Sequence, residues 1–187
     1  MKSPKNKGNS FERFMSKKLS LWLTDGQSDN VVWRTDTSGG RSTVKIKHEK
    51  MDSVVSANIG DLKRVSVLGE YPAVDLFFNR FMVELKCGYS NAFEMYPPLS
   101  KIFETIIDKA IKDSFNANKR LALIVKSDRK KILFISDYLF KNEKGRFFYI
   151  ISILTDYPAK RNLYVYLLDD LLKYKFLDLL NKYSILE

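Results

Sequence analysis

The sequence predicts an α/β fold with a mixed β-sheet, and three features of its hydrophobic pattern support this. The run 121–125 is entirely apolar, which is typical of a central strand buried on both faces. The stretches 11–23 and 99–111 repeat apolar residues every three or four positions, which predicts amphipathic helices. Shorter apolar runs lie between and after them, and such mixing of strands with helices is typical of an α/β domain.

Composition limits the classes of protein that fit. The chain has 187 residues, of which 45% are hydrophobic, enough for one domain with a substantial core. We expect a flexible basic arm at 1–8, a single domain at 9–187 and no membrane span. One cysteine and one histidine exclude an internal disulfide and leave too few ligands for zinc, and they favour a reducing, cytoplasmic location. The net charge of +10 favours a polyanionic partner such as nucleic acid, although a lysine-rich solvated surface is the simpler reading.

The first helix is expected to begin near Asn9, a plausible N-cap followed three residues later by Glu12, as in a capping box. Glu12 therefore has a structural reading as part of the cap and a functional one as a carboxylate that reaches into a site. The other expected elements are strands at 31–34, 60–68, 73–78, 81–88, 131–135, 147–154 and 163–167, and a closing amphipathic helix at 169–183.

The strand at 81–88 carries Glu84 and Lys86, two charged residues in an otherwise apolar segment. Side chains alternate along a strand, so both point to the same face. Burying them costs free energy unless each finds a partner. They could form a structural ion pair, or Glu84 could bind a divalent cation while Lys86 faces a phosphate or a water.

An aspartate is expected next to Glu84. If Asn79 and Arg80 form a tight hairpin turn, Asp75 lies directly across from Glu84, and two neighbouring carboxylates repel unless they share a cation. Asp61, at the start of the strand 60–68, competes with Asp75 for this role.

Basic and hydroxyl residues gather around a glycine-containing loop. Arg34 ends a predicted strand, and Ser38 and Arg41 flank Gly39 and Gly40. Such residues suit contacts to phosphate oxygens, although a solvated loop is the alternative reading. Further candidates for contacts to the nucleic-acid backbone, each with surface solvation as the simpler reading, are Lys17, Lys18, Lys126, Arg129, Lys130 and Lys131.

In this order, a helical Glu, a strand Asp and Glu-x-Lys on the next strand, the sequence resembles the PD-(D/E)xK nuclease superfamily. The closest likeness is to Holliday-junction-resolvase-like and phage-type endonucleases. The matching segments are 7–13 with Glu12, Arg34 with 38–41, Gly60-Asp61-Leu62, and Val83-Glu84-Leu85-Lys86. The resemblance covers residues 7–136. The spacing from Asp61 to Glu84 is longer than resolvase-like members usually have; we favour Asp61 over Asp75 because Gly-Asp at a strand start matches the family pattern.

The resemblance implies a restriction-endonuclease-like core, a mixed β-sheet flanked by helices, and metal-dependent endonuclease activity on DNA. Mg²⁺, for which Mn²⁺ should substitute, would be held by Asp61, Glu84 and the Leu85 carbonyl. Lys86 would orient or deprotonate the attacking water, and Glu12 would bind a second metal or a metal-bound water. The substrate could be a branched junction, as for resolvases, and such members often form homodimers. A phage or prophage origin fits the same likeness.

Two other functional readings remain open. The chain could be a nucleic-acid-binding protein on the same fold without catalysis. It could also be a plain α/β domain in which Glu84 and Lys86 form an ion pair and Glu12 caps a helix.

Overall fold

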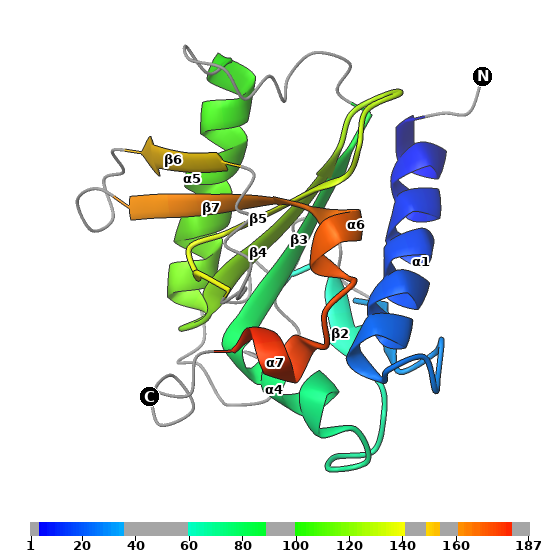
Figure 1. Cartoon of the computed structure of the whole chain (residues 1–187). Coiled ribbons are helices and arrows are strands. Elements are labelled where there is room, and N and C mark those ends of the chain that lie inside the picture. The colour runs from blue at the N-terminus through cyan, green and yellow to red at the C-terminus, as the bar shows by residue number, and fades with distance from the viewer. Residues whose placement is uncertain (1–3, 36–59, 89–99, 141–148, 154–160, 181–187) are drawn as a thin grey trace.

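The computed structural model describes residues 4–35, 60–88, 100–140, 149–153 and 161–180. Helices and strands are interspersed along these segments (Figure 1). The elements are, in chain order, α1 (Pro4–Leu23), β1 (Val32–Arg34), β2 (Leu62–Arg64), α4 (Pro72–Arg80), β3 (Phe81–Cys87), α5 (Lys101–Asn116), β4 (Arg120–Lys126), β5 (Leu133–Ser136), β6 (Tyr149–Ile153), β7 (Arg161–Leu167), α6 (Leu168–Leu171) and α7 (Phe176–Leu179).

Five strands form one mixed sheet in the order β3-β4-β5-β7-β6. β3 and β4 run parallel, and the other neighbouring strands run antiparallel. β4 has a partner on each side, and residues 121–125 are at most 1% exposed, which confirms the predicted central buried strand. β3 ends the order, so one of its edges does not pair with a strand of this sheet. β1 and β2 form a separate antiparallel pair.

Helices cover both faces of the large sheet, with α1 and α5 on opposite sides (Figure 1). Met82, Leu121 and Leu123 point into a core beneath α5. Their neighbours along the strands, such as Val83 and Ala122, point into a larger core shared with α1, α4, α6 and α7. A mixed sheet with helices packed on both faces confirms the predicted α/β architecture, and it is consistent with a restriction-endonuclease-like core. Within the described residues, no helix is both long and apolar enough to cross a membrane.

Both long helices occur where the sequence predicts them, with one error at a start. Ser100 caps α5 by accepting a hydrogen bond from the backbone N–H of Phe103 (3.2 Å). α1 begins at Pro4 rather than near Asn9, so residues 4–8 are helical and not part of an arm. Proline suits the first turn of a helix because its missing N–H has no partner there. The predicted cap at Asn9 is therefore wrong.

The predicted strand at 73–78 and the hairpin after it are also wrong, because this segment forms α4, which leads directly into β3. Val74, Phe77 and Phe78 are its buried residues, at the three- and four-residue spacing of a helical face. Pro72 opens the helix and Arg80 lies in its last turn, where both residue types are favourable. A short apolar run does not by itself distinguish a strand from a helix.

The C-terminal region replaces the predicted helix 169–183 with two short helices, α6 and α7. The Trp22 indole N–H donates a hydrogen bond to the backbone carbonyl of Tyr174 (2.7 Å), in the segment between them. That segment thus joins the core through α1 instead of continuing a helix. The remaining predicted strands correspond to β1, β2, β5, β6 and β7 with shifted or shortened ends.

Candidate active site

β3 places Glu84 and Lys86 on the same face of the sheet, as their spacing predicts. That face lies beneath α5, because Met82, two residues before Glu84, packs in the α5 core. The Lys86 ammonium donates to Glu84 Oε1 in an ion pair, and the two side chains are only 25% and 14% exposed. The strand therefore holds opposite charges together in a mostly buried position.

Asp61 lies against the edge of β3 that does not pair with β4. Its backbone N–H donates to the carbonyl of Val83 (2.7 Å), and its Oδ2 accepts a hydrogen bond from the backbone N–H of Leu85 (2.8 Å). Gly60 permits this close approach, because its φ is +100° and a Cβ there would lie 2.5 Å from the Val83 carbonyl oxygen. Gly60 thus fixes the Asp61 carboxylate beside the strand that carries Glu84 and Lys86.

A threonine holds the same segment from its other side. Thr35, which follows β1, donates its hydroxyl to the carbonyl of Gly60 (2.8 Å) and its backbone N–H to the carbonyl of Asp61 (3.0 Å). The Thr35 side chain is buried. The Gly60-Asp61 peptide is therefore held between β3 and the end of β1.

Leu85 contributes its backbone to this edge. The N–H and C=O of one residue in a strand point to the same edge, so the Leu85 carbonyl faces the side on which Asp61 accepts the Leu85 N–H. Lys86 Nζ lies 3.5 Å from that carbonyl oxygen. Carboxylate and carbonyl oxygens of Asp61, Glu84 and Leu85 are therefore available close to one lysine.

Electrostatics set Asp61 apart from its neighbours. The pKa of Asp61 is raised to about 7, chiefly by burial and then by the nearby Glu84 carboxylate. The hydrogen bond from Leu85 and the charge of Lys86 lower this pKa, and Glu12 raises it slightly. No Lys or Arg side chain among the described residues forms an ion pair with Asp61. A partly buried carboxylate without its own cation is typical of functional sites.

Glu12 approaches the same region from α1. It forms an ion pair with Arg34 of β1, and Arg34 Nη2 also donates to Asn9 Oδ1 (2.9 Å). Arg34, which the sequence predicts to contact nucleic acid, thus fixes the position of Glu12. The effect of Glu12 on the Asp61 pKa shows that the two carboxylates are within electrostatic reach of each other.

This donor set fits a hard divalent cation. Mg²⁺ prefers oxygen ligands, takes one or two protein carboxylates and keeps several waters. Within the described segments, no three Asp, Glu, His or Cys side chains form a ready-made metal cage. The ion pairs of Glu84 with Lys86 and of Glu12 with Arg34 occupy two of the carboxylates. Asp61, Glu84 and the Leu85 carbonyl supply oxygen donors of the type that such a cation prefers.

Asp75, the alternative to Asp61, lies on α4. Its carboxylate forms an ion pair with Arg64 and accepts a hydrogen bond from the backbone N–H of Gly69 (2.7 Å). Because there is no hairpin between α4 and β3, Asp75 is not the cross-strand neighbour of Glu84. The structure brings Asp61, and not Asp75, to the edge of β3.

Sequence reasoning missed three residues near this site. Asn9 and Thr35 act through the contacts described above, and neither side chain carries a pattern that indicates such a role. Asp113 of α5 is the third: its pKa is raised by burial foremost and also by Glu84, whereas Lys109 lowers it. Asp113 therefore adds negative charge near Glu84 from the covering helix. Ser38 and Arg41, the other predicted nucleic-acid contacts, lie outside the described residues.

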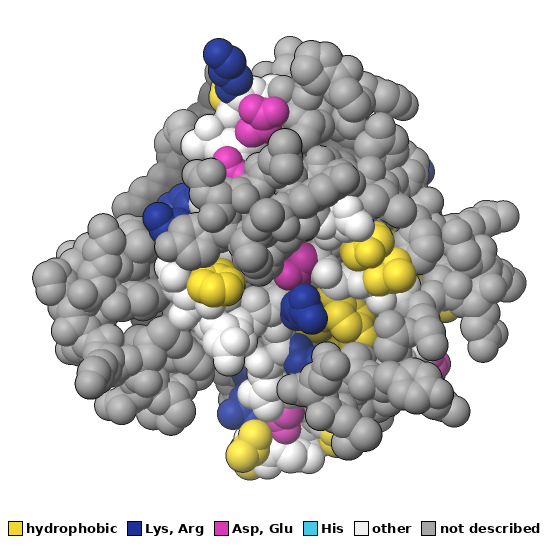
Figure 2. Space-filling view, turned by 90° about the vertical axis from the view of Figure 1, so that its left-hand side faces the viewer, with side chains coloured by type: hydrophobic (Ala, Val, Ile, Leu, Met, Phe, Trp, Pro, Cys, Tyr) yellow, Lys and Arg dark blue, Asp and Glu magenta, His cyan; other side chains and the backbone are white. Residues whose placement is uncertain are grey.

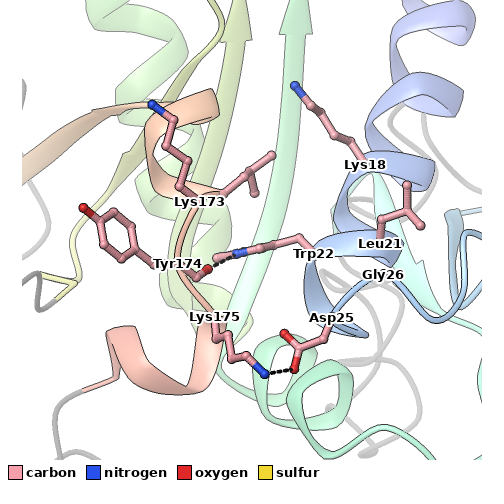
Figure 3. Close-up of a pocket in the computed structure, with 9 residues that line it drawn as sticks. Lys18, Leu21, Trp22, Asp25, Gly26, Lys173, Tyr174 and Lys175 are labelled. Carbon is pink, nitrogen blue, oxygen red and sulfur yellow. Dashed lines mark hydrogen bonds and ion pairs between the residues drawn. The ribbon is translucent and has the colours of Figure 1, made fainter.

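Two surface cavities lie apart from these residues. One, of about 350 Å³, lies between α1 and residues 172–175, where Lys175 pairs with Asp25 (2.9 Å) (Figure 3). The other, of about 280 Å³, is lined by Arg120, Asp137, Asn162 and Tyr164. Figure 2 shows basic side chains next to acidic ones on the face it views, so its described side chains form no surface of a single charge sign.

Comparison with known proteins gives one match. The sequence model of a family described as "Phage putative PDDEXK endonuclease" matches residues 3–181 of this chain. The match includes α1, β2, β3 and the C-terminal elements after residue 136, to which the resemblance seen in the sequence does not extend. No curated protein and no solved structure matches the chain.

Proposed function

Since the chain belongs to this family of phage PDDEXK endonucleases, we propose that it is a metal-dependent endonuclease that hydrolyses phosphodiester bonds in DNA. One observation carries the proposal: Gly60 locks Asp61 against the open edge of the strand that bears Glu84 and Lys86. A structural role for Asp61 would not require a partly buried carboxylate without an ion-pair partner beside a second carboxylate.

Each residue has a proposed task. Asp61, Glu84 and the Leu85 carbonyl bind Mg²⁺, which when bound supplies a Lewis acid and a more acidic water. Lys86 leaves Glu84 and donates a hydrogen bond to the attacking water or to a phosphate oxygen, where negative charge develops. Glu12, positioned by Arg34, holds a second water or cation.

The finer parts of the proposal concern substrate and assembly. DNA rather than RNA, a preference for branched substrates, homodimer formation and replacement of Mg²⁺ by Mn²⁺ all rest on the likeness to resolvase-like nucleases. Ser38 and Arg41 would contact phosphates, and Arg34 would do so when it is not paired with Glu12. We also propose that the chain forms a single domain, which takes in the whole of α1 and not only residues 9–187, because both cores are built on one sheet.

The test incubates the purified chain with labelled duplex, single-stranded and four-way-junction DNA in Mg²⁺, Mn²⁺ or EDTA. We expect cleavage only with metal, and a loss of about 10³-fold or more in Glu84→Gln and Lys86→Ala. Glu104→Gln and Lys112→Ala, which remove exposed charges on α5, serve as matched controls and should cleave normally. Cleavage at the wild-type rate by Glu84→Gln would overturn the proposal.

A second candidate function is DNA binding without cleavage. It is favoured by the ion pairs that occupy both Glu84 and Glu12, because paired carboxylates can be purely structural. This candidate predicts salt-sensitive binding to DNA and no cleavage with either metal on any of the three substrates.

A further inference from the structure

α1 carries an exposed phenylalanine next to two lysines, beside the proposed cleavage residues. Phe14 is 46% exposed, and the ammonium groups of Lys18 and Lys126 lie 5.5 and 5.9 Å from the centre of its ring. We propose that Phe14, Lys18 and Lys126, here called the phosphate clamp, bind the phosphate backbone of the nucleic acid. The inference rests on the proposed function, because it assigns part of the substrate-binding surface.

The aromatic ring explains how two like charges are held together. Each ammonium is attracted to the negative face of a ring at this distance, so Phe14 orders two long side chains that would otherwise be mobile. Lys126 is also 6.0 Å from the ring of Phe11.

The local charges leave room for an anion. Lys18 forms an ion pair with Asp169 of α6, and this carboxylate competes with a phosphate. Lys126 is exposed and forms no ion pair with any carboxylate of the described residues. In Figure 3 the Lys18 side chain, which lines the cavity between α1 and residues 172–175, extends away from Asp25 and Trp22.

The position of the clamp favours nucleic acid over another partner. Phe11 precedes Glu12, and Lys126 is the β4 partner of Cys87, which follows Lys86. Figure 1 shows the N-terminal half of α1 beside this end of β3 and β4. The clamp therefore lies at the end of β3 that follows Lys86, on the face of the sheet that α1 covers, and we expect the part of the substrate that extends beyond the cleaved bond to reach it.

The test measures the affinity for a short fluorescein-labelled DNA duplex by anisotropy in EDTA, over a series of salt concentrations. Lys126→Ala should weaken binding roughly fivefold and reduce the slope of log K against log salt by about one. Phe14→Ala removes no charge but should weaken binding about two- to fivefold, because the lysines lose their common support. Asp169→Asn should tighten binding, because Lys18 loses its competing carboxylate.

Two variants serve as controls. Phe14→Tyr keeps the ring and should bind normally. Lys17→Ala removes one positive charge from the same helix, but Lys17 pairs with Asp29 (3.3 Å) and should contribute less than Lys126. Phe14 and Lys126 are exposed, so their variants are expected to fold, which circular dichroism can check.

The outcomes separate this inference from the proposed function. Binding in EDTA does not depend on cleavage, so a chain that never cuts DNA could still show the effects of Phe14→Ala and Asp169→Asn. If Phe14→Ala and Lys126→Ala bind DNA as tightly as the wild type, the clamp is overturned even where cleavage is intact. Equal losses in Lys17→Ala and Lys126→Ala, with none in Phe14→Ala, would also overturn it, since that pattern reflects general charge alone.

Discussion

Asp61 lies against the edge of β3, and Asp75 lies on α4, the helix that leads into β3. The surroundings of the two carboxylates differ. Asp75 has an arginine and a backbone amide as partners, and its side chain is 13% exposed. Asp61 accepts a hydrogen bond from Leu85 but forms no ion pair with a described residue, and Glu84 and Glu12 add negative charge nearby. Asp75 has ion-pair and hydrogen-bond partners in the fold. In contrast, burial and the nearby carboxylates disfavour the charged form of Asp61.

This difference shows how a structural carboxylate can be told from a functional one. Partners offset the cost of burying an acid, as Arg64 and Gly69 do for Asp75, and removal of one member of such a pair leaves an uncompensated charge. The ionised form of an acid such as Asp61 lowers the stability of the folded chain. Its carboxylate stays beside β3 only because the surrounding backbone holds it there. Here Gly60 and Thr35 provide that geometry.

The largest expected effect is on cleavage. Asp61→Asn should reduce metal-dependent cleavage by about 10³-fold or more, because it removes a charged metal ligand. Asp75→Asn should leave cleavage within a few-fold of the wild type but lower the free energy of unfolding by about 1–3 kcal/mol, because Arg64 loses its partner. Nuclease assays and urea denaturation of both variants measure the contrast. The reverse pattern, an inactive Asp75→Asn and an active Asp61→Asn, would contradict the assignment of Asp61 rather than Asp75 to the cleavage site.

A glycine substitution tests whether geometry imposes the position of Asp61. Gly60→Ala should lower the free energy of unfolding by roughly 2–5 kcal/mol and cleavage by about 10²-fold, since the new methyl group would push Asp61 away from β3. Gly69→Ala is the matched control: Gly69 also has a positive φ, +85°, but a Cβ there would meet nothing within 4 Å. It should cost only about 1–2 kcal/mol and leave cleavage unchanged. Equal effects at the two glycines would show that the contact with Val83 is unimportant.

The smallest expected effect is a pH dependence of stability. Because the pKa of Asp61 is raised to about 7, the folded chain holds this proton more tightly than the unfolded chain does. Between about pH 4 and pH 7 the free energy of unfolding should therefore fall as pH rises, by the contribution of this group. Asp61→Asn should lack this loss, so its stability relative to the wild type should increase from pH 5 to pH 8 in EDTA. Added Mg²⁺ should stabilise the wild type, and not the variant, at pH 8.

Sequence reasoning found the parts of the site that depend on local pattern. The strand at 81–88, its Glu84-Lys86 pair on one face and the long helices follow from periodicity, and the structure has them. The choice of Asp61 over Asp75 rested on a Gly-Asp pattern, whose physical reason is the contact between Gly60 and Val83. That contact joins segments distant in sequence and could not be derived from spacing.

The sequence mispredicts secondary structure where tertiary contacts decide between two conformations that the local pattern allows equally. The apolar run at 73–78 suits either a strand or a helix, and Pro72 was the overlooked signal for a helix start. The interruption of the C-terminal helix depends on Trp22, far away in the chain. The pairing of Arg34 with Glu12 likewise requires α1 and β1 to pack together, so the sequence could identify both residues but not their contact.

The contacts of Thr35 have a consequence for residues 36–59. Thr35 and Gly60 are hydrogen-bonded to each other, so this segment leaves and re-enters the described structure at one point. When the fold already holds the two ends of a segment together, a change in the segment's length costs little additional loop-closure entropy. Changes of length within 36–59 are therefore expected to leave the contact between Thr35 and Gly60, and with it the position of Asp61 against β3, in place.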